Sequence, residues 1–212
     1  MTNIACVLFD LDGTLVDTID LIRQSFDYAV KAVLGLTLSK EKLLENVGRP
    51  LLAQMESFSP ARAGELMDAY NRHNLAHHDR HIRAYPHAVE TLQKLKGRSL
   101  RLAVVTSKKR ELALRGLSLT GLLEYMDLVV AMEDTTRHKP EPEPVVLAMR
   151  QLECGPEQTL FVGDSPFDMA AGRAAGAYIG AAYWGPFDPE QLDVFKPDIQ
   201  LFGLADLPQL IP

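Results

Sequence analysis

Two carboxylates, Asp10 and Asp12, lie two residues apart where the apolar run 4–8 gives out. Branched side chains dominate that run, as in a strand that is buried on both faces of a parallel sheet. Two like charges held close together need a cation or a shared proton, and carboxylate oxygens suit Mg²⁺. Gly13 lets the chain turn sharply, and Thr14 can offer a hydroxyl or an amide to an anion. The segment therefore predicts a reaction centre, with an ordinary Asx turn as the alternative.

Three further polar motifs follow along the chain, two of them directly after apolar runs that are typical of strands. In order they are Thr106-Ser107, Lys139-Pro140 and Gly163-Asp164-Ser165-Pro166-Phe167-Asp168. Together with Asp10-Leu11-Asp12-Gly13-Thr14-Leu15-Val16-Asp17, they resemble the four motifs of the haloacid dehalogenase-like (HAD) phosphohydrolase superfamily. The motifs keep the family's order and span nearly the whole chain. The resemblance is to subfamily IA, which has a C1 helical cap, and within it to the phosphoglycolate phosphatase and pyrophosphatase branch.

From residue 86 onward the chain alternates short apolar runs with helical patterns. Such alternation predicts an α/β fold with a doubly wound, Rossmann-like parallel sheet, whose ligands bind at the carboxyl ends of the strands. Helices are expected over 86–96, 110–119, 143–152 and 168–175, and strands over 100–105, 127–132, 159–162, 178–183 and 198–202.

The block between residues 17 and 84 contains helical patterns and no strand pattern. Helices are expected around 21–33, 39–45 and 59–81. We therefore expect a small all-helical cap domain, residues 17–84, inserted after the first strand of a core domain made of residues 1–16 and 85–212. A cap in this place matches the C1 cap of the family.

The resemblance implies a catalytic role for four residues. Asp10 would be the nucleophile that becomes an aspartyl phosphate, which water then hydrolyses. Asp12 would protonate the leaving oxygen and later activate the water, and an acid in this place argues against a dehalogenase. Thr106 would bind a phosphoryl oxygen, and Lys139 would neutralise the nucleophile and the phosphoryl group.

The resemblance also implies one Mg²⁺ ion. Its ligands would be Asp10, the backbone carbonyl of Asp12, and Asp164, with water and substrate in the remaining positions. Asp168 would orient the metal ligands without binding the metal itself, and it can cap the following helix at the same time.

Residues that bind the substrate are expected in the motifs and in the helical block. Arg49 could clamp a second anionic group in bidentate fashion, or be an exposed turn residue. His73, His77 and His81 are spaced four apart on one helix face beside His78; a transition-metal site, hydrogen bonding under the cap and plain exposure all stay open. The expected substrate-binding residues are Gly13, Thr14, Arg49, His73, Ser107 and Lys108.

Composition limits the classes of function. Hydrophobic residues make up 47% and charged residues 24% of the chain, as in ordinary globular proteins. The net charge of -6 argues against a nucleic-acid partner, and no apolar run reaches the length of about 18 residues that a membrane span needs. The two cysteines cannot make a disulfide framework, and Cys6 is expected as a small buried side chain in a reducing compartment.

These observations predict a cytoplasmic, Mg²⁺-dependent phosphatase, monomeric or homodimeric, with no membrane partner. Its substrate would be a small phosphorylated metabolite such as phosphoglycolate, or pyrophosphate. A phosphomutase of the beta-phosphoglucomutase type shares all four motifs and stays open, and a catalytically silent regulatory protein is a further alternative. One departure from the family is His87, where glycine is common.

Overall fold

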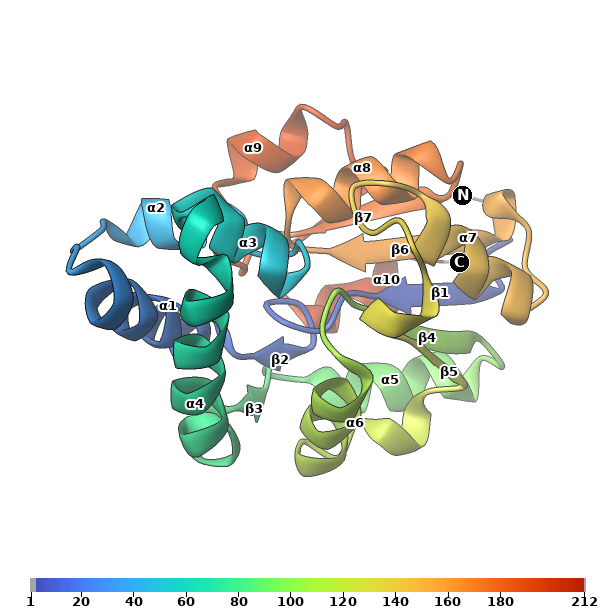
Figure 1. Ribbon diagram of the computed structural model, residues 1–212. Helices are drawn as coiled ribbons and strands as arrows, with labels where there is room; N and C mark the ends of the chain where they lie inside the picture. The colour runs from blue at the N-terminus through green and yellow to red at the C-terminus, as the bar shows by residue number, and fades with distance from the viewer. Residues whose placement is uncertain (1–2, 212) are drawn as a thin grey trace.

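The computed structural model describes residues 3–211, so residues 1–2 and 212 of the expected core domain lie outside it. Within that range, a six-stranded sheet of parallel strands in the order β5-β4-β1-β6-β7-β8 forms the centre of the molecule (Figure 1). The strands are β1 (Cys6–Phe9), β4 (Arg101–Val105), β5 (Leu128–Val130), β6 (Thr159–Gly163), β7 (Tyr178–Ala182) and β8 (Ile199–Leu201). Along the chain, β4 and then β5 are added on one side of β1. The chain then crosses to the other side of β1, where it forms β6. Ligands of such sheets bind at this reversal, outside the carboxyl ends of the strands.

Helices cover both faces of the sheet, as a parallel sheet requires. Val7 and Phe9 point into an apolar cluster with residues of α5 and α6, whereas Cys6 and Leu8 point into a second cluster with residues of α7 and α8. Figure 1 shows these two pairs of helices on opposite sides of the strands. The helices of this part are α5 (Ala88–Gly97), α6 (Arg110–Leu119), α7 (Glu143–Gln151), α8 (Pro166–Ala174), α9 (Pro189–Asp193) and α10 (Leu207–Leu210).

The helical block between β1 and α5 shares one apolar cluster with residues of α8, β7 and α9. Phe26 and Val30 of α1 pack there with Leu66 and Tyr70 of α4, and Figure 1 shows the two helices side by side, away from the sheet. The elements are β2 (Val16–Asp17), α1 (Ile19–Leu34), α2 (Lys40–Leu44), α3 (Leu51–Phe58), α4 (Ala63–His81) and β3 (Arg83–Ala84). Across residues 3–211, no helix is both long and apolar enough to cross a membrane.

The expected α/β architecture is confirmed, with two corrections in the helical block. The expectation of no strand there was wrong, because β2 and β3 pair as a short antiparallel ribbon. Helix α3 was not expected at all. All three elements are too short to be recognised from hydrophobic periodicity, because the strands have two residues each and α3 has eight.

Cys6 and Cys154 form a disulfide, with Cα atoms 6.5 Å apart. The expectation that Cys6 is a small buried side chain is confirmed, and its pairing with Cys154 was not expected. Cys154 lies in the turn before β6, and β6 pairs directly with β1. With a separation of 148 residues, no local sequence pattern could indicate that the two side chains meet.

His87 precedes α5 with a φ of 63°, in the left-handed region that glycine enters at no steric cost. We expect His87→Gly to be at least as stable as the natural protein. His87→Val, with a branched side chain, should have a free energy of unfolding about 1–2 kcal/mol below that of the glycine variant. Urea unfolding measures both, and equal midpoints for the two variants would contradict strain at this residue.

Candidate active site

Three polar side chains lie at the carboxyl ends of the three central strands. Asp10 follows β1, Thr106 follows β4 and Asp164 follows β6, and these strands are neighbours in the order β4-β1-β6. The Asp10 residue is 4% exposed and Asp164 is 1% exposed. Residues that are about 95 and 150 positions from Asp10 in the sequence therefore meet at one edge of the sheet, as the parallel fold predicts.

Lys139 joins this group from the loop between β5 and α7. Its ammonium donates to Asp10 Oδ1 at 2.6 Å, to Asp168 Oδ1 at 2.7 Å and to the Val105 carbonyl at 3.2 Å. The residue is 2% exposed, so water contributes almost nothing to its solvation. All three protons of the ammonium have acceptors in the protein, which fixes its position against Asp10.

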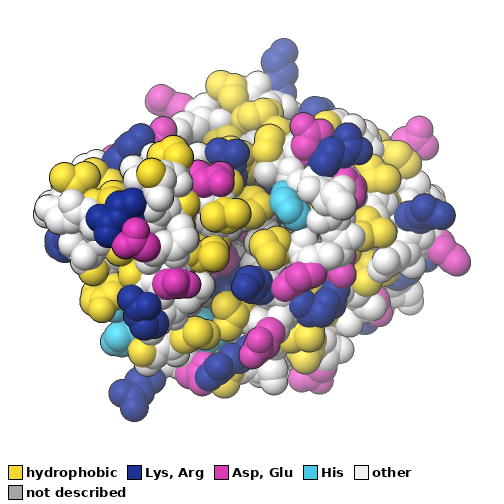
Figure 2. All heavy atoms as spheres, in the orientation of Figure 1, with side chains coloured by type: hydrophobic (Ala, Val, Ile, Leu, Met, Phe, Trp, Pro, Cys, Tyr) yellow, Lys and Arg dark blue, Asp and Glu magenta, His cyan; other side chains and the backbone are white. Residues whose placement is uncertain are grey.

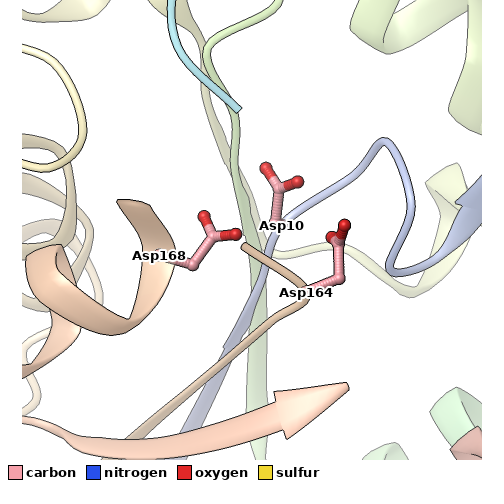
Figure 3. A group of neighbouring side chains, drawn as sticks. All are labelled: Asp10, Asp164 and Asp168. Atoms are coloured by element: carbon pink, nitrogen blue, oxygen red, sulfur yellow. The ribbon is translucent and has the colours of Figure 1, made fainter. Parts of the chain in front are cut away.

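Asp168 is held by hydrogen bonds on both carboxylate oxygens. Its Oδ1 accepts from Lys139, and its Oδ2 accepts from the backbone N–H of Ser165 at 3.0 Å and from the Ser165 hydroxyl. Ser165 in turn caps α8 by accepting from the Asp168 N–H at 3.2 Å. This reciprocal capping box aims Asp168 toward Asp10 (Figure 3).

Asp10, Asp164 and Asp168 form a buried acidic group whose nearest oxygens all lie within 4.8 Å of one another (Figure 3). Thr14 donates to Asp164 Oδ1 at 2.5 Å. Among residues 3–211, Oδ2 of Asp10 and Oδ2 of Asp164 accept no hydrogen bond, whereas both oxygens of Asp168 are engaged. The hydrogen bonds therefore favour Asp10 and Asp164 as metal ligands, with Asp168 behind them.

The space around Asp164 is kept open by two glycines. A Cβ atom added at Gly13 or at Gly185 would overlap the Asp164 carboxylate. Gly13 also has a φ of +90°, which a residue with a side chain rarely adopts. The two unused oxygens are of the hard type that Mg²⁺ prefers, so this pocket fits a magnesium ion with few protein ligands.

The charge balance of the group also fits a bound cation. Burial raises the pKa of Asp10 to about 7, although Lys139 acts in the opposite direction. Burial, together with the charge of Asp10, raises the pKa of Asp164 well above its ordinary value. Burial opposes the charge of Lys139, but Asp10 and Asp168 outweigh it and raise the pKa of the ammonium. One ammonium among three buried carboxylates leaves negative charge that a divalent cation would compensate.

Asp12 forms its hydrogen bonds with residues outside this acidic group. Its Oδ1 accepts from the Lys108 ammonium at 2.7 Å and from the Thr18 hydroxyl at 2.8 Å. Lys108 is placed next to Thr106, whose Oγ1 accepts from the Lys108 N–H at 3.2 Å. These contacts hold the Asp12 carboxylate at the edge of a cavity that Asp10 also lines.

That cavity, of about 570 Å³, lies between the sheet and the helical block. Its polar lining includes Asp10, Asp12, Arg49, Thr106 and Lys108, and Figure 2 shows hydrophobic side chains gathered around a hollow between the two parts of the molecule. The apolar lining comes from Ile22, Val47, Leu51, Leu52, Met67, Tyr70, Leu112 and Met132.

The loop before α3 closes over this cavity. The Ser107 hydroxyl donates to the Gly48 carbonyl at 2.7 Å, which joins the end of β4 to the helical block. Arg49 lies over the ring of Phe167, 5.9 Å from the ring centre, and lines the cavity. A direct link from Ser107 to the helical block was not expected, because it depends on the three-dimensional approach of two loops.

The structure does not bring His73 to the cavity. It lies on the face of α4 toward α1, where it lines a separate surface pocket with Tyr28. Residues of α4 that do line the cavity are Tyr70, Asn71 and Asn74. The expected Gly13 and Thr14 lie against Asp164 instead of in the cavity lining. Their nearness to Asp164 is consistent with shaping the metal pocket.

The fold and the site together define a class of proteins in which a parallel sheet carries a buried carboxylate site beneath a set of helices. A family model described as haloacid dehalogenase-like hydrolase matches residues 7–182. The chain belongs to the haloacid dehalogenase-like hydrolase family, and the resemblance seen in the motifs is confirmed.

Relatives of similar length are found in several bacteria. A protein from Caldanaerobacter subterraneus subsp. tengcongensis is 41% identical over 99% of this chain and 94% of its own length. The pyrophosphatase PpaX of Oceanobacillus iheyensis is 36% identical over 97% of this chain and 95% of its own length. Among solved structures, a haloacid dehalogenase-like hydrolase from Streptococcus pneumoniae superimposes with a TM-score of 0.87, at 24% identity over 98% of each chain. The structural likeness supports the fold alone.

Stability of the metal-free protein should fall as the pH rises from about 4 to 7. Asp10 loses its proton near 3.8 in the unfolded chain but near 7 in the folded protein. Between these values the folded state binds more protons, so the free energy of unfolding decreases with pH. Bound Mg²⁺ favours the ionised carboxylates, so the rise in Tm that it produces should be larger at about pH 8 than at about pH 5.

Calorimetry with EDTA or with Mg²⁺ across this pH range measures the effect. Asp164→Asn should shrink the effect of Mg²⁺ on Tm, whereas Asp20→Asn, a substitution at an exposed residue of α1, should leave it unchanged. A metal-free Tm that increases between about pH 5 and pH 7 would contradict the raised carboxyl pKa values.

Proposed function

We propose that this protein is a Mg²⁺-dependent phosphohydrolase that uses Asp10 as its nucleophile and pyrophosphate as a principal substrate. The observation that carries the proposal is the position of Asp10: buried at the end of the central strand, bound to Lys139, beside Asp164, and in the lining of a cavity. The name of the Oceanobacillus iheyensis relative supports pyrophosphate as the substrate.

The first chemical step would transfer a phosphoryl group to Asp10. The carboxylate attacks phosphorus, the bond to the leaving oxygen breaks, and an aspartyl phosphate forms. Lys139 fixes the orientation of Asp10 and offsets negative charge where it accumulates. Asp10, Asp164 and the backbone of Asp12 would hold Mg²⁺, which when bound would offset further charge on the phosphoryl oxygens.

Asp12 would transfer the protons. In the first step it gives a proton to the leaving oxygen; in the second it accepts a proton from the water that attacks the aspartyl phosphate, and phosphate is released. Its hydrogen bonds to Lys108 and Thr18 hold it facing the cavity, where a leaving group would lie. Thr106, with the backbone amides that follow it, would bind the phosphoryl oxygens of the bound substrate.

Residues 17–84 would act as a cap domain over a core of residues 1–16 and 85–212. Support comes from the close packing of α1 against α4, and from the loop before α3, whose residues line the cavity. Arg49 and Lys108 would supply positive charge to the second phosphoryl group of pyrophosphate.

A phosphate monoester with an apolar organic part is a second candidate substrate. The cavity of about 570 Å³ has the size of sites that hold medium-sized organic ligands, and it is far larger than pyrophosphate. Its apolar wall, formed by residues such as Leu51, Met67 and Met132, would contact the organic part.

Substitution of Asp10 and Asp12 tests the proposed mechanism. Asp10→Asn should abolish phosphate release, because an amide cannot form the acyl phosphate. Asp12→Asn should lower kcat by about 10²- to 10⁴-fold and let a phosphoryl adduct accumulate on Asp10, which mass spectrometry after acid quenching detects. Asp20→Asn is the matched control. An active Asp10→Asn enzyme in a preparation free of contaminating phosphatase would rule out the assignment.

Substitution of Arg49 separates the two candidate substrates. Arg49→Met keeps the packing on Phe167 but removes the charge, so KM for pyrophosphate should rise roughly tenfold or more. The KM for an aryl monoester such as p-nitrophenyl phosphate should change little. Arg72→Met, at an exposed position of α4, is the control. Equal losses on both substrates would argue against a contact between Arg49 and a second phosphoryl group.

A further inference from the structure

Three histidines form a ladder along one face of α4, one helical turn apart. The ring of His77 lies between those of His73 and His81, with ring centres at 4.4 Å and 5.7 Å. On the other side of His73, the ring of Tyr28 from α1 stacks at 4.9 Å. We call His73, His77 and His81 the histidine ladder. None of them lines the cavity of the candidate active site.

The hydrogen bonds of the ladder determine where each neutral ring carries its proton. Nδ1 of His77 contacts the His73 carbonyl at 2.7 Å, and Nδ1 of His81 contacts the His77 carbonyl at 2.9 Å. A carbonyl oxygen can only accept, so both Nδ1 atoms must donate. In a neutral imidazole the remaining nitrogen, Nε2, then has a free lone pair.

His73 also carries its proton on Nδ1, because of a different contact. Its Nδ1 lies 3.1 Å from the Ser25 hydroxyl oxygen. That hydroxyl already donates its proton to the Leu21 carbonyl at 2.8 Å, so it can only accept from His73. The Nε2 atom of His73 therefore also has a free lone pair.

The Nε2 atoms of the ladder are open to a ligand. Within residues 3–211 they form no hydrogen bond with the protein, and His73 and His77 are half-buried while His81 is exposed. A histidine that binds a metal through one nitrogen commonly donates the other N–H to a carbonyl or a similar acceptor, which is the arrangement found here. Burial lowers the pKa of His73, and the neighbouring His77 and His81 lower it further, so this ring stays neutral near pH 7.

We propose that the histidine ladder binds one divalent transition-metal ion of the Ni²⁺, Cu²⁺ or Zn²⁺ type, with Nε2 of His77 and Nε2 of a histidine one turn away as ligands. Imidazole nitrogen suits these ions, whereas Mg²⁺ prefers oxygen, so the site is chemically distinct from the acidic group. Among residues 3–211, three His, Cys, Asp or Glu side chains bring ligand atoms within 4.8 Å of one another only at Asp10, Asp164 and Asp168. The proposed site therefore has two protein ligands, and water would fill the other positions around the ion.

Titration of the tag-free protein with Ni²⁺, in the presence of excess Mg²⁺, tests the proposal. Calorimetry should detect about one equivalent of Ni²⁺, and His77→Ala should abolish this binding because His77 belongs to both possible pairs. Loss of binding in His73→Ala or in His81→Ala identifies the second ligand. His87→Gly removes a histidine elsewhere without strain and is the matched control.

Cu²⁺ gives a second readout that does not depend on the candidate active site. Its electron paramagnetic resonance spectrum should show coupling to imidazole nitrogen in the natural protein and in Asp164→Asn, and should lose it in His77→Ala. Circular dichroism checks that each variant is folded. Unchanged Ni²⁺ affinity in a folded His77→Ala protein, or Cu²⁺ bound by oxygen alone, would overturn the proposal.

Discussion

The central constraint in this molecule is that one buried ammonium must offset the charge of several buried carboxylates. Lys139 contacts Asp10 and Asp168 directly, and Asp164 lies in the same group with no ammonium of its own. Removing such charges from water costs several kcal/mol per ion, so they persist only where hydrogen bonds and opposite charges are fixed in place. The hydrogen bonds of Lys139 and Asp168 fix the group in place, and its excess of carboxylates is consistent with a bound cation.

The rest of the fold supplies that fixed geometry. Strands β1, β4 and β6 are held in parallel register, so their ends lie at one edge of the sheet. Helix α8 begins there with a capping box that uses Ser165 and Asp168, so one aspartate both starts a helix and holds Lys139. Glycines at positions 13 and 185 leave room beside Asp164 that any larger residue would fill. Helix capping and turn geometry, which depend on local sequence, therefore position carboxylates and an ammonium that act together as one site.

Much of this arrangement could be predicted from the sequence because its signals are local. Buried parallel strands are short apolar runs, and polar residues directly after them must lie at the ligand-binding edge. The contacts that escaped prediction join distant segments without any local pattern: Thr18 and Lys108 to Asp12, Ser107 to Gly48, and Cys6 to Cys154. His73 shows the limit of helical periodicity, since spacing places three histidines on one face but cannot say which neighbour that face meets.

The paired strands β2 and β3 have a mechanical consequence. The chain passes between the sheet and the helical block twice, and the two passages are joined as an antiparallel ribbon, with Tyr85 N–H also donating to the Leu15 carbonyl at 3.0 Å. Because the two passages are joined, they would act as one hinge, which would resist twisting and sideways sliding of the helices more than a swing. Thr18 lies just beyond this ribbon, so an outward swing of α1 would draw its hydroxyl away from Asp12 and would link the position of the helices to the hydrogen bonding of that carboxylate.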